Sequence, residues 1–134
     1  MDSYQYQAEI AKFDEAEGVV YGFVTVYEEA GELVWDRQND AIDETEVRKM
    51  AHRYVSEARV AKVMHGGQPV GEVVESIVLT RDIQKALGID LGKAGWFIGM
   101  KLHDEGIKAR VRNGSLAAFS IGGKGIRRDY EEQQ

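Results

Sequence analysis

The chain has 134 residues, of which 43% are hydrophobic and 30% are charged, so it fits one globular domain with a modest core. Its net charge of −6 argues against a general nucleic-acid-binding function, which usually requires a basic face. The absence of cysteine excludes disulfides, thiolate nucleophiles and cysteine-ligated zinc. No apolar run approaches the roughly 20 residues of a membrane span, and we expect a cytosolic protein without a membrane partner.

Two strands are predicted at the beginning of the chain. Apolar and polar residues alternate over 4–10, which is the period of a half-buried strand. A polar turn over 14–18 ends in glycine, and the β-branched and aromatic segment 19–27 then predicts a second strand, paired with the first as a hairpin. A short apolar stretch follows at 33–35.

The strongest helix signal lies at 43–58. Asp43 can cap the N-terminus, and Glu46 follows at the spacing of a capping box. The apolar residues that follow recur at helical spacing along one stripe: Val47, Met50, Ala51, Tyr54, Val55 and Ala58. This pattern predicts a helix docked on a sheet.

The second half of the chain indicates further strands and one or two short helices. Strands are predicted at 59–64, 70–79, 95–102 and 116–121, with a loop at 66–69. A short helix or an insertion is predicted at 80–87, and a short helix at 104–113. The residues 127–134 are polar. We therefore expect a single α+β, mainly β domain over 1–134, with its core at about 18–126.

Two segments carry candidate chemistry. Val63-Met64-His65-Gly66-Gly67 places an imidazole at the end of an apolar run, and Phe119-Ser120-Ile121-Gly122-Gly123 places a hydroxyl before two glycines. A serine needs a base to act as a nucleophile at neutral pH, and histidine is the usual one. Backbone N–H groups near the glycines could stabilise an oxyanion. The alternatives are a structural histidine and a serine bonded within a sheet.

The ordered set of motifs resembles the XkdF-like family of phage prohead proteases, within the wider group of caudovirus prohead proteases and herpesvirus assemblins. Besides the two segments above, the matching motifs are Val19-Val20-Tyr21-Gly22, Asp36-Arg37-Gln38-Asn39-Asp40, Ala51-His52-Arg53-Tyr54, Val73-Val74-Glu75-Ser76, Gly95-Trp96-Phe97-Ile98-Gly99 and Arg112-Asn113-Gly114-Ser115-Leu116. They cover roughly 18–126. The resemblance implies an assemblin-like antiparallel β-barrel with one long helix and one or two short ones.

The chain departs from the family pattern in two places. Asn39 stands where glycine is usual, and asparagine tolerates the left-handed backbone conformation that such a turn needs. The phage branch usually continues beyond the nucleophile strand into another strand that carries an acidic residue, and this chain stops soon after Ser120. We therefore expect a fragment or an unusually short member.

The resemblance implies that His65 is the general base and Ser120 the nucleophile, with Ser115 as the competing serine. Glu75 is the first candidate for the group that orients His65, and a Ser–His dyad without a third member is also open. The other candidates for this third group are Asp40, His103, Asp129, Glu131 and Glu132. Backbone N–H groups of Gly122 and Gly123 are candidate oxyanion donors. His52 falls off the apolar stripe of its helix and is read as a surface or packing residue. The histidines have no metal-site spacing, so no metal or cofactor is expected.

The resemblance further implies a serine endopeptidase that matures a phage procapsid. Its substrates would be the scaffold protein, the major capsid protein and the protease itself, inside the assembling procapsid in the bacterial cytoplasm. Substrate would bind as an extended strand beside the barrel, and a homodimer is left open. The alternative functions are an inactive protease-fold module for assembly or scaffold docking, and a β-rich hydrolase of another class.

Overall fold

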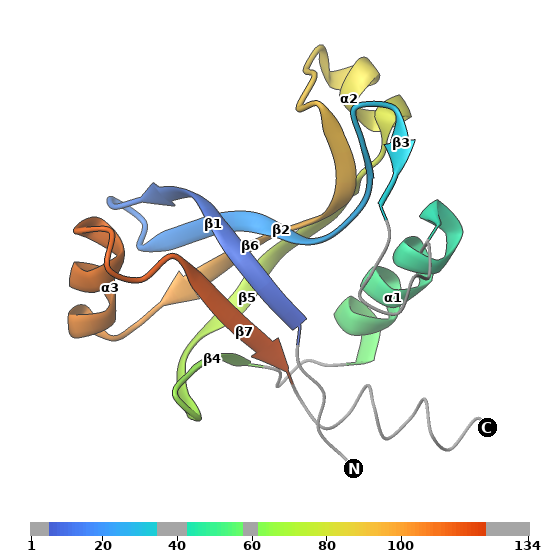
Figure 1. Ribbon diagram of the computed structural model, residues 1–134. Helices are drawn as coiled ribbons and strands as arrows, with labels where there is room; N and C mark the ends of the chain where they lie inside the picture. The colour runs from blue at the N-terminus through green and yellow to red at the C-terminus, as the bar shows by residue number, and fades with distance from the viewer. Residues whose placement is uncertain (1–5, 35–42, 58–61, 123–134) are drawn as a thin grey trace.

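The computed structural model describes residues 6–34, 43–57 and 62–122 (Figure 1). The strands are β1 (Tyr6–Asp14), β2 (Val19–Glu29), β3 (Glu32–Leu33), β4 (Lys62–His65), β5 (Gln68–Leu79), β6 (Lys93–Leu102) and β7 (Ala118–Gly122). The helices are α1 (Glu44–Glu57), α2 (Arg81–Leu87) and α3 (Glu105–Arg112). Within the described residues, no helix is long and apolar enough to cross a membrane.

Six of the strands form a closed antiparallel barrel. Their order is β1-β7-β4-β5-β6-β2, and β1 pairs again with β2 to complete the ring, while β3 extends β2. The long strands β2, β5 and β6 continue beyond the ring towards α2 (Figure 1). The expected mainly β barrel with one long and two short helices is confirmed.

Glycines allow the strands of the barrel to approach closely. A Cβ atom on Gly22 would overlap the carbonyl oxygen of Glu9, at the pairing of β1 with β2 that closes the ring. Gly71 and Gly95 have equivalent conflicts with carbonyl oxygens of Lys101 and Thr25. A side chain at any of these positions would therefore push two backbones apart.

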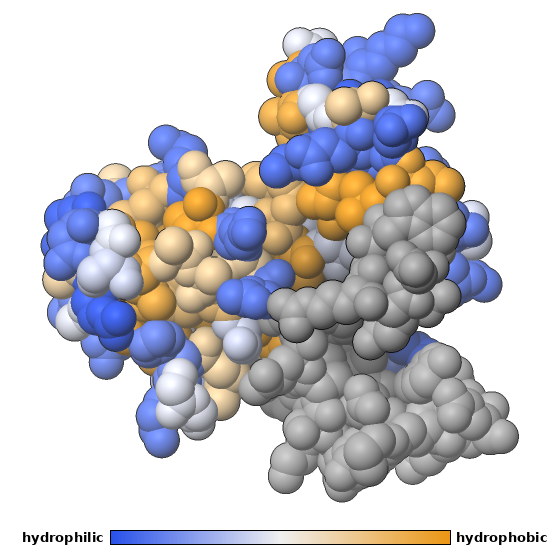
Figure 2. All heavy atoms as spheres, in the orientation of Figure 1, coloured by the Kyte–Doolittle hydropathy of each residue, from blue (hydrophilic) through white to orange (hydrophobic). Residues whose placement is uncertain are grey.

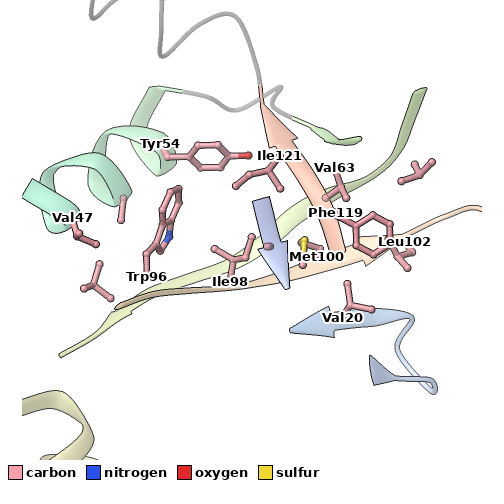
Figure 3. Close-up of a cluster of buried hydrophobic side chains, with 14 of the residues drawn as sticks. Val20, Val47, Tyr54, Val63, Trp96, Ile98, Met100, Leu102, Phe119 and Ile121 are labelled. Atoms are coloured by element: carbon pink, nitrogen blue, oxygen red, sulfur yellow. The ribbon is translucent and has the colours of Figure 1, made fainter. Parts of the chain in front are cut away.

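The core fills the barrel and continues beneath α1 (Figure 3). Trp96, Ile98 and Met100 of β6 are completely buried, as expected for alternate residues on the inner face of a strand. On α1, Val47, Ala51 and Tyr54 are buried, and the Tyr54 ring meets the Trp96 ring edge-on with centroids 5.3 Å apart. These three members of the predicted stripe dock the helix on the barrel, whereas Val55, also predicted on the stripe, is 58% exposed and Ala58 lies outside the described residues.

Each helix begins at a side chain that caps it, and for α1 this is the predicted Asp43. The carboxylate of Asp43 accepts a hydrogen bond from the Glu46 N–H at 2.9 Å, and Asp104 caps α3 by accepting from the Ile107 N–H at 2.9 Å. Thr80 caps α2 in the same way. These side chains satisfy N–H groups that the first turn of a helix leaves unpaired.

The predicted loop at 66–69 is shorter in the structure than the sequence indicated. The connection between β4 and β5 is the two-residue turn Gly66-Gly67, and both residues have positive φ, at 59° and 81°. Such a turn matches the twist of paired strands, so β5 begins at Gln68 and already includes Pro69. This tight hairpin fixes His65 as the last residue of β4.

Candidate active site

Strands β4 and β7, which carry the predicted base and nucleophile, lie next to each other. They pair antiparallel, with Met64 opposite Ser120 and Val63 opposite Ile121. Ser120 is therefore displaced by one residue from the position opposite His65. The fold brings two segments that are distant in sequence onto neighbouring strands (Figure 1).

Ser120 faces outwards from the barrel. Its neighbours Phe119 and Ile121 are 2% and 0% exposed and point into the core (Figure 3). Because successive side chains of a strand point to opposite faces, Ser120 lies on the outer face and is partly exposed. Its cross-strand partners are Gln7 on β1 and Met64 on β4.

The side chain of His65 points to the opposite face of the sheet from Ser120, towards the core. It is two residues after Val63, which is completely buried, and its ring packs edge-on against Phe119 with centroids 6.5 Å apart. Its Nε2 atom lies 3.1 Å from Nη1 of Arg110 on α3. Among the described residues, no hydrogen bond joins His65 to Ser120. The imidazole is thus at the inner side of the barrel rim, and the hydroxyl is on the outer side.

Both edges of β7 are occupied at Ser120. β1 pairs with Ala118–Ile121 of this strand and β4 pairs with Ser120–Gly122. An extended peptide therefore cannot add as a further strand beside Ser120 without displacing one of them. The outer face of the barrel is the side from which Ser120 can be approached.

Glu75, the first candidate for the orienting group, is not close to His65. His65 is opposite Gln68, and Glu75 is seven residues further along β5, or about 20 Å at the usual strand rise. The Glu75 carboxylate instead accepts a hydrogen bond from the Tyr21 hydroxyl at 2.9 Å, which raises the pKa of that phenol. The physical reason is the length of β5, which carries Glu75 away from the Gly66-Gly67 turn.

The other candidates for the group that orients His65, and the proposed oxyanion donors, do not complete the site within the described residues. His103 contacts Glu72, with 3.1 Å between Nε2 and the carboxylate oxygen, and not His65. Gly122 ends β7 opposite Lys62. Four acidic candidates and one proposed oxyanion donor lie outside the described residues: Asp40, Asp129, Glu131, Glu132 and Gly123. The assignments of His65, Ser120 and the oxyanion donors stay predictions.

The competing serine has a structural role. The Ser115 N–H donates to the Asn113 side chain at 2.8 Å, and its hydroxyl donates to the Arg110 carbonyl at 3.4 Å. These bonds close the turn after α3. They agree with the interpretation that Ser115 ends the helix.

His52 lies elsewhere, on the exposed side of α1. It lines a groove of about 430 Å³ between α1, β5 and α2, together with Ser76 and Ile83. The Ser76 hydroxyl accepts a hydrogen bond from the Trp96 indole at 2.8 Å. Around α2, hydrophobic side chains are visible among hydrophilic ones (Figure 2). The large aliphatic residues that are exposed on α2, on β3 and in the segment after α2 are Leu33, Ile83, Leu87, Ile89 and Leu91.

Arg110 is the residue at this site that sequence reasoning missed. A basic residue in a short surface helix ordinarily indicates only a solvated face. Its contact with His65 depends on how α3 packs beside the end of β4, which no local pattern encodes. Within the described part of the chain, no group of three His, Asp or Glu side chains could hold a metal ion.

The fold and site together define a β-barrel domain with a serine on one strand and a histidine at the end of the next. The family model described as "Putative phage serine protease XkdF" matches residues 7–129. The chain therefore belongs to this phage serine protease family. No curated protein and no solved structure matches the chain.

Proposed function

We propose that the protein is a serine endopeptidase in which Ser120 is the nucleophile and His65 the general base. The observation that supports this best is the pairing of β4 with β7, which places Ser120 one residue from His65 in a member of a phage serine protease family. The two residues lie on adjacent hydrogen-bonded strands, and their side chains point to opposite faces. Proton transfer therefore requires a rearrangement that brings both side chains to one face.

The reaction requires the imidazole to turn from the inner side of the rim towards Ser120. His65 is the last residue of β4, directly before the Gly66-Gly67 turn. Because a rotamer change leaves the direction of the Cα–Cβ bond unchanged, this movement needs a change in the backbone at His65, beside two glycines that tolerate one. His65 would then take the Ser120 proton during attack on the peptide carbonyl and return it to the leaving amine. Backbone N–H groups near Gly122 and Gly123 are the proposed oxyanion donors.

The proposed substrates are the scaffold protein, the major capsid protein and the protease itself, cleaved inside a procapsid in the bacterial cytoplasm. Family membership supports this setting, because the family is a phage serine protease family. Since both edges of β7 are occupied at Ser120, we propose that substrate crosses the outer face of the barrel near Gln7 and Met64.

Cleavage of co-expressed scaffold and capsid protein tests the proposal. Ser120→Ala and His65→Ala should each reduce cleavage by about a millionfold, to an undetectable level, as expected when the nucleophile or base of one catalytic unit is removed. Ser115→Ala and His52→Ala are the matched controls and should cleave like the parent chain. Full cleavage by both Ser120→Ala and His65→Ala would overturn the proposal. Loss of cleavage only in Ser115→Ala would move the nucleophile to that residue.

A second candidate function is a protease-fold module that docks on scaffold or capsid protein without cleaving it. The observation that favours it is the placement of the imidazole and the hydroxyl on opposite faces of the β4–β7 pair. In that case a Ser120→Ala, His65→Ala double variant would support normal procapsid assembly. Failure of the double variant to yield mature particles, with normal yield from the Ser115→Ala control, would exclude it.

A further inference from the structure

Arg110 connects the two strands of the candidate site. Its guanidinium Nη1 lies 3.1 Å from His65 Nε2, at the end of β4. Its carbonyl oxygen accepts hydrogen bonds from the Leu116 N–H at 3.1 Å and from the Ser115 hydroxyl at 3.4 Å, in the segment that leads into β7. One residue of α3 is thus bonded both to the predicted base and to the approach to the predicted nucleophile.

The chemistry of the contact fixes the state of the imidazole. A guanidinium has five N–H donors and no acceptor, and it stays protonated in proteins. In its hydrogen bond with Arg110, His65 Nε2 must therefore be the acceptor, so the ring is neutral with its proton on Nδ1. The Nε2 lone pair is then engaged, and the ring is held edge-on against Phe119.

The neighbouring cations of α3 are bonded differently. Lys108 pairs with Glu105 at 3.0 Å, and Arg112 pairs with Glu15 at 2.7 Å. Among the described residues, the Arg110 side chain has no carboxylate partner and its contact is the His65 ring. The pairing of Arg112 also makes it a matched control, since it is on the same helix and does not contact His65.

We propose that Arg110 is a positioning residue that locks His65 on the inner side of the barrel rim, with Nε2 occupied and Nδ1 protonated. The imidazole becomes available to Ser120 only when this hydrogen bond opens. The consequence for cleavage rests on the proposed peptidase function, whereas the lock itself concerns only the state of the His65 ring.

Two measurements on the ring test the lock in Arg110→Gln, with Arg112→Gln as control. The first is the rate at which diethyl pyrocarbonate acylates each histidine, followed by peptide mass spectrometry, with His52 and His103 as internal references. Acylation needs a free, unprotonated ring nitrogen, so the His65 rate should rise about fivefold in Arg110→Gln, as expected for loss of a partly exposed charge-assisted hydrogen bond. It should not change in Arg112→Gln. The second is the pair of ¹⁵N ring shifts of His65, which should move away from the Nδ1-protonated pattern only in Arg110→Gln.

A conservative variant and the cleavage assay separate the outcomes. Arg110→Lys keeps the charge but lacks the guanidinium fork, and should give an intermediate acylation rate; it also covers the case in which Arg110→Gln does not fold. Unchanged acylation and ring shifts in both variants would overturn the lock, whatever the cleavage assay gives. Faster acylation with no cleavage by any variant would support the lock and count against the peptidase function. If both proposals hold, Arg110→Gln should cleave scaffold several-fold faster than the parent chain.

Discussion

At the scale of single residues, Gln84 shows how one polar side chain can hold a substructure. It lies on α2 and is 1% exposed. Its amide donates to the carbonyl oxygens of Leu79 at 3.0 Å and Lys93 at 2.8 Å, and its side-chain oxygen accepts from the Leu91 N–H at 2.8 Å. It therefore ties the end of β5 and the start of β6 to the helix between them.

Replacing Gln84 with Ala should lower the free energy of unfolding by about 2–4 kcal/mol, because three backbone groups, one in a buried and two in part-buried hydrogen bonds, would lose their partner. Chemical denaturation measures this loss. Hydrogen exchange at the Leu91 amide should accelerate in parallel. Lys85→Ala, an exposed neighbour on α2, should change stability by less than about 0.5 kcal/mol. A Gln84→Ala variant as stable as the Lys85→Ala control would show that water replaces these hydrogen bonds.

A second residue-scale prediction concerns Gly22, where an added Cβ meets the Glu9 backbone. Backbone atoms cannot move aside as a flexible side chain can, so Gly22→Ala should cost about 3 kcal/mol or more and open the β1–β2 pairing. Gly67→Ala is the comparison: its φ is 81° and nothing lies within 4 Å, so only the backbone conformation opposes it, at about 1–2 kcal/mol. Equal losses in urea unfolding would contradict the close approach of the strands.

The candidate site shows how far the sequence could predict geometry at this scale. The motifs placed His65 at the end of one strand and Ser120 within another, and both positions agree with the structure. The face of each side chain could not be predicted, because it depends on the register of β4 against β7. Met64 rather than His65 is opposite Ser120, and a shift of one residue would exchange the faces.

At the scale of elements, α2 and the end of β2 are joined by an ion pair. Arg81, the first residue of α2, bonds to the Glu28 carboxylate through Nε at 2.5 Å and Nη2 at 2.8 Å. The Gly31 N–H donates to the same carboxylate at 2.7 Å. The hydrogen bonds from Arg81, with that from Gly31, lower the pKa of Glu28 from 4.5 to about 2. The sequence predicted a short helix or an insertion at 80–87, and it did not indicate the partner of Arg81, which lies more than fifty residues earlier in the chain.

This pair predicts a pH dependence of stability. Because the folded pKa of Glu28 is below its unfolded value, the unfolded chain binds more protons between pH 4.5 and about 2. The stabilisation is complete above about pH 4.5 and is lost as the pH falls through this window. Arg81 is 41% exposed, so screening by solvent makes the effect on stability small.

Glu28→Gln tests this dependence by denaturation at pH 5 and at pH 2.5. The parent chain should be more stable than the variant at pH 5, and the difference should be much smaller at pH 2.5, near the lower end of this window. Glu29→Gln, the adjacent residue at the end of β2, is the control and should not show the same convergence. A constant difference between parent and Glu28→Gln at both pH values would contradict the assignment.

At the scale of the whole molecule, the ring of strands joins the two ends of the described chain. β1 begins at Tyr6 and β7 ends at Gly122, yet the first four residues of β1 pair with Ala118–Ile121 of β7. Family resemblance predicted a barrel, whereas the strand order could not be derived from periodicity, because period two reports only that a strand is half-buried. The pairing of β7 with both β1 and β4 is what leaves the outer face as the approach to Ser120.

An engineered disulfide tests both the closure and the outward direction of Ser120. The chain has no cysteine, so any pair introduced into it is the only pair. Gln7 and Ser120 are directly opposite on β1 and β7, where Cα atoms of paired strands lie about 4.5–5.5 Å apart, within disulfide range. Gln7→Cys with Ser120→Cys should therefore oxidise readily and raise the free energy of unfolding by as much as about 4 kcal/mol, since the bridge closes a loop of more than about 100 residues.

The control pair is Gln7→Cys with Phe119→Cys. Phe119 is adjacent to Ser120 in the chain but points into the core, so its thiol should lie on the other face of β7 from the Gln7 thiol. Oxidation is followed by intact mass and by the melting temperature with and without reductant. Equal crosslinking of the two pairs would mean that the face of Ser120 is not fixed. Crosslinking of the Phe119 pair alone would place Ser120 inside the barrel, on the same side as His65.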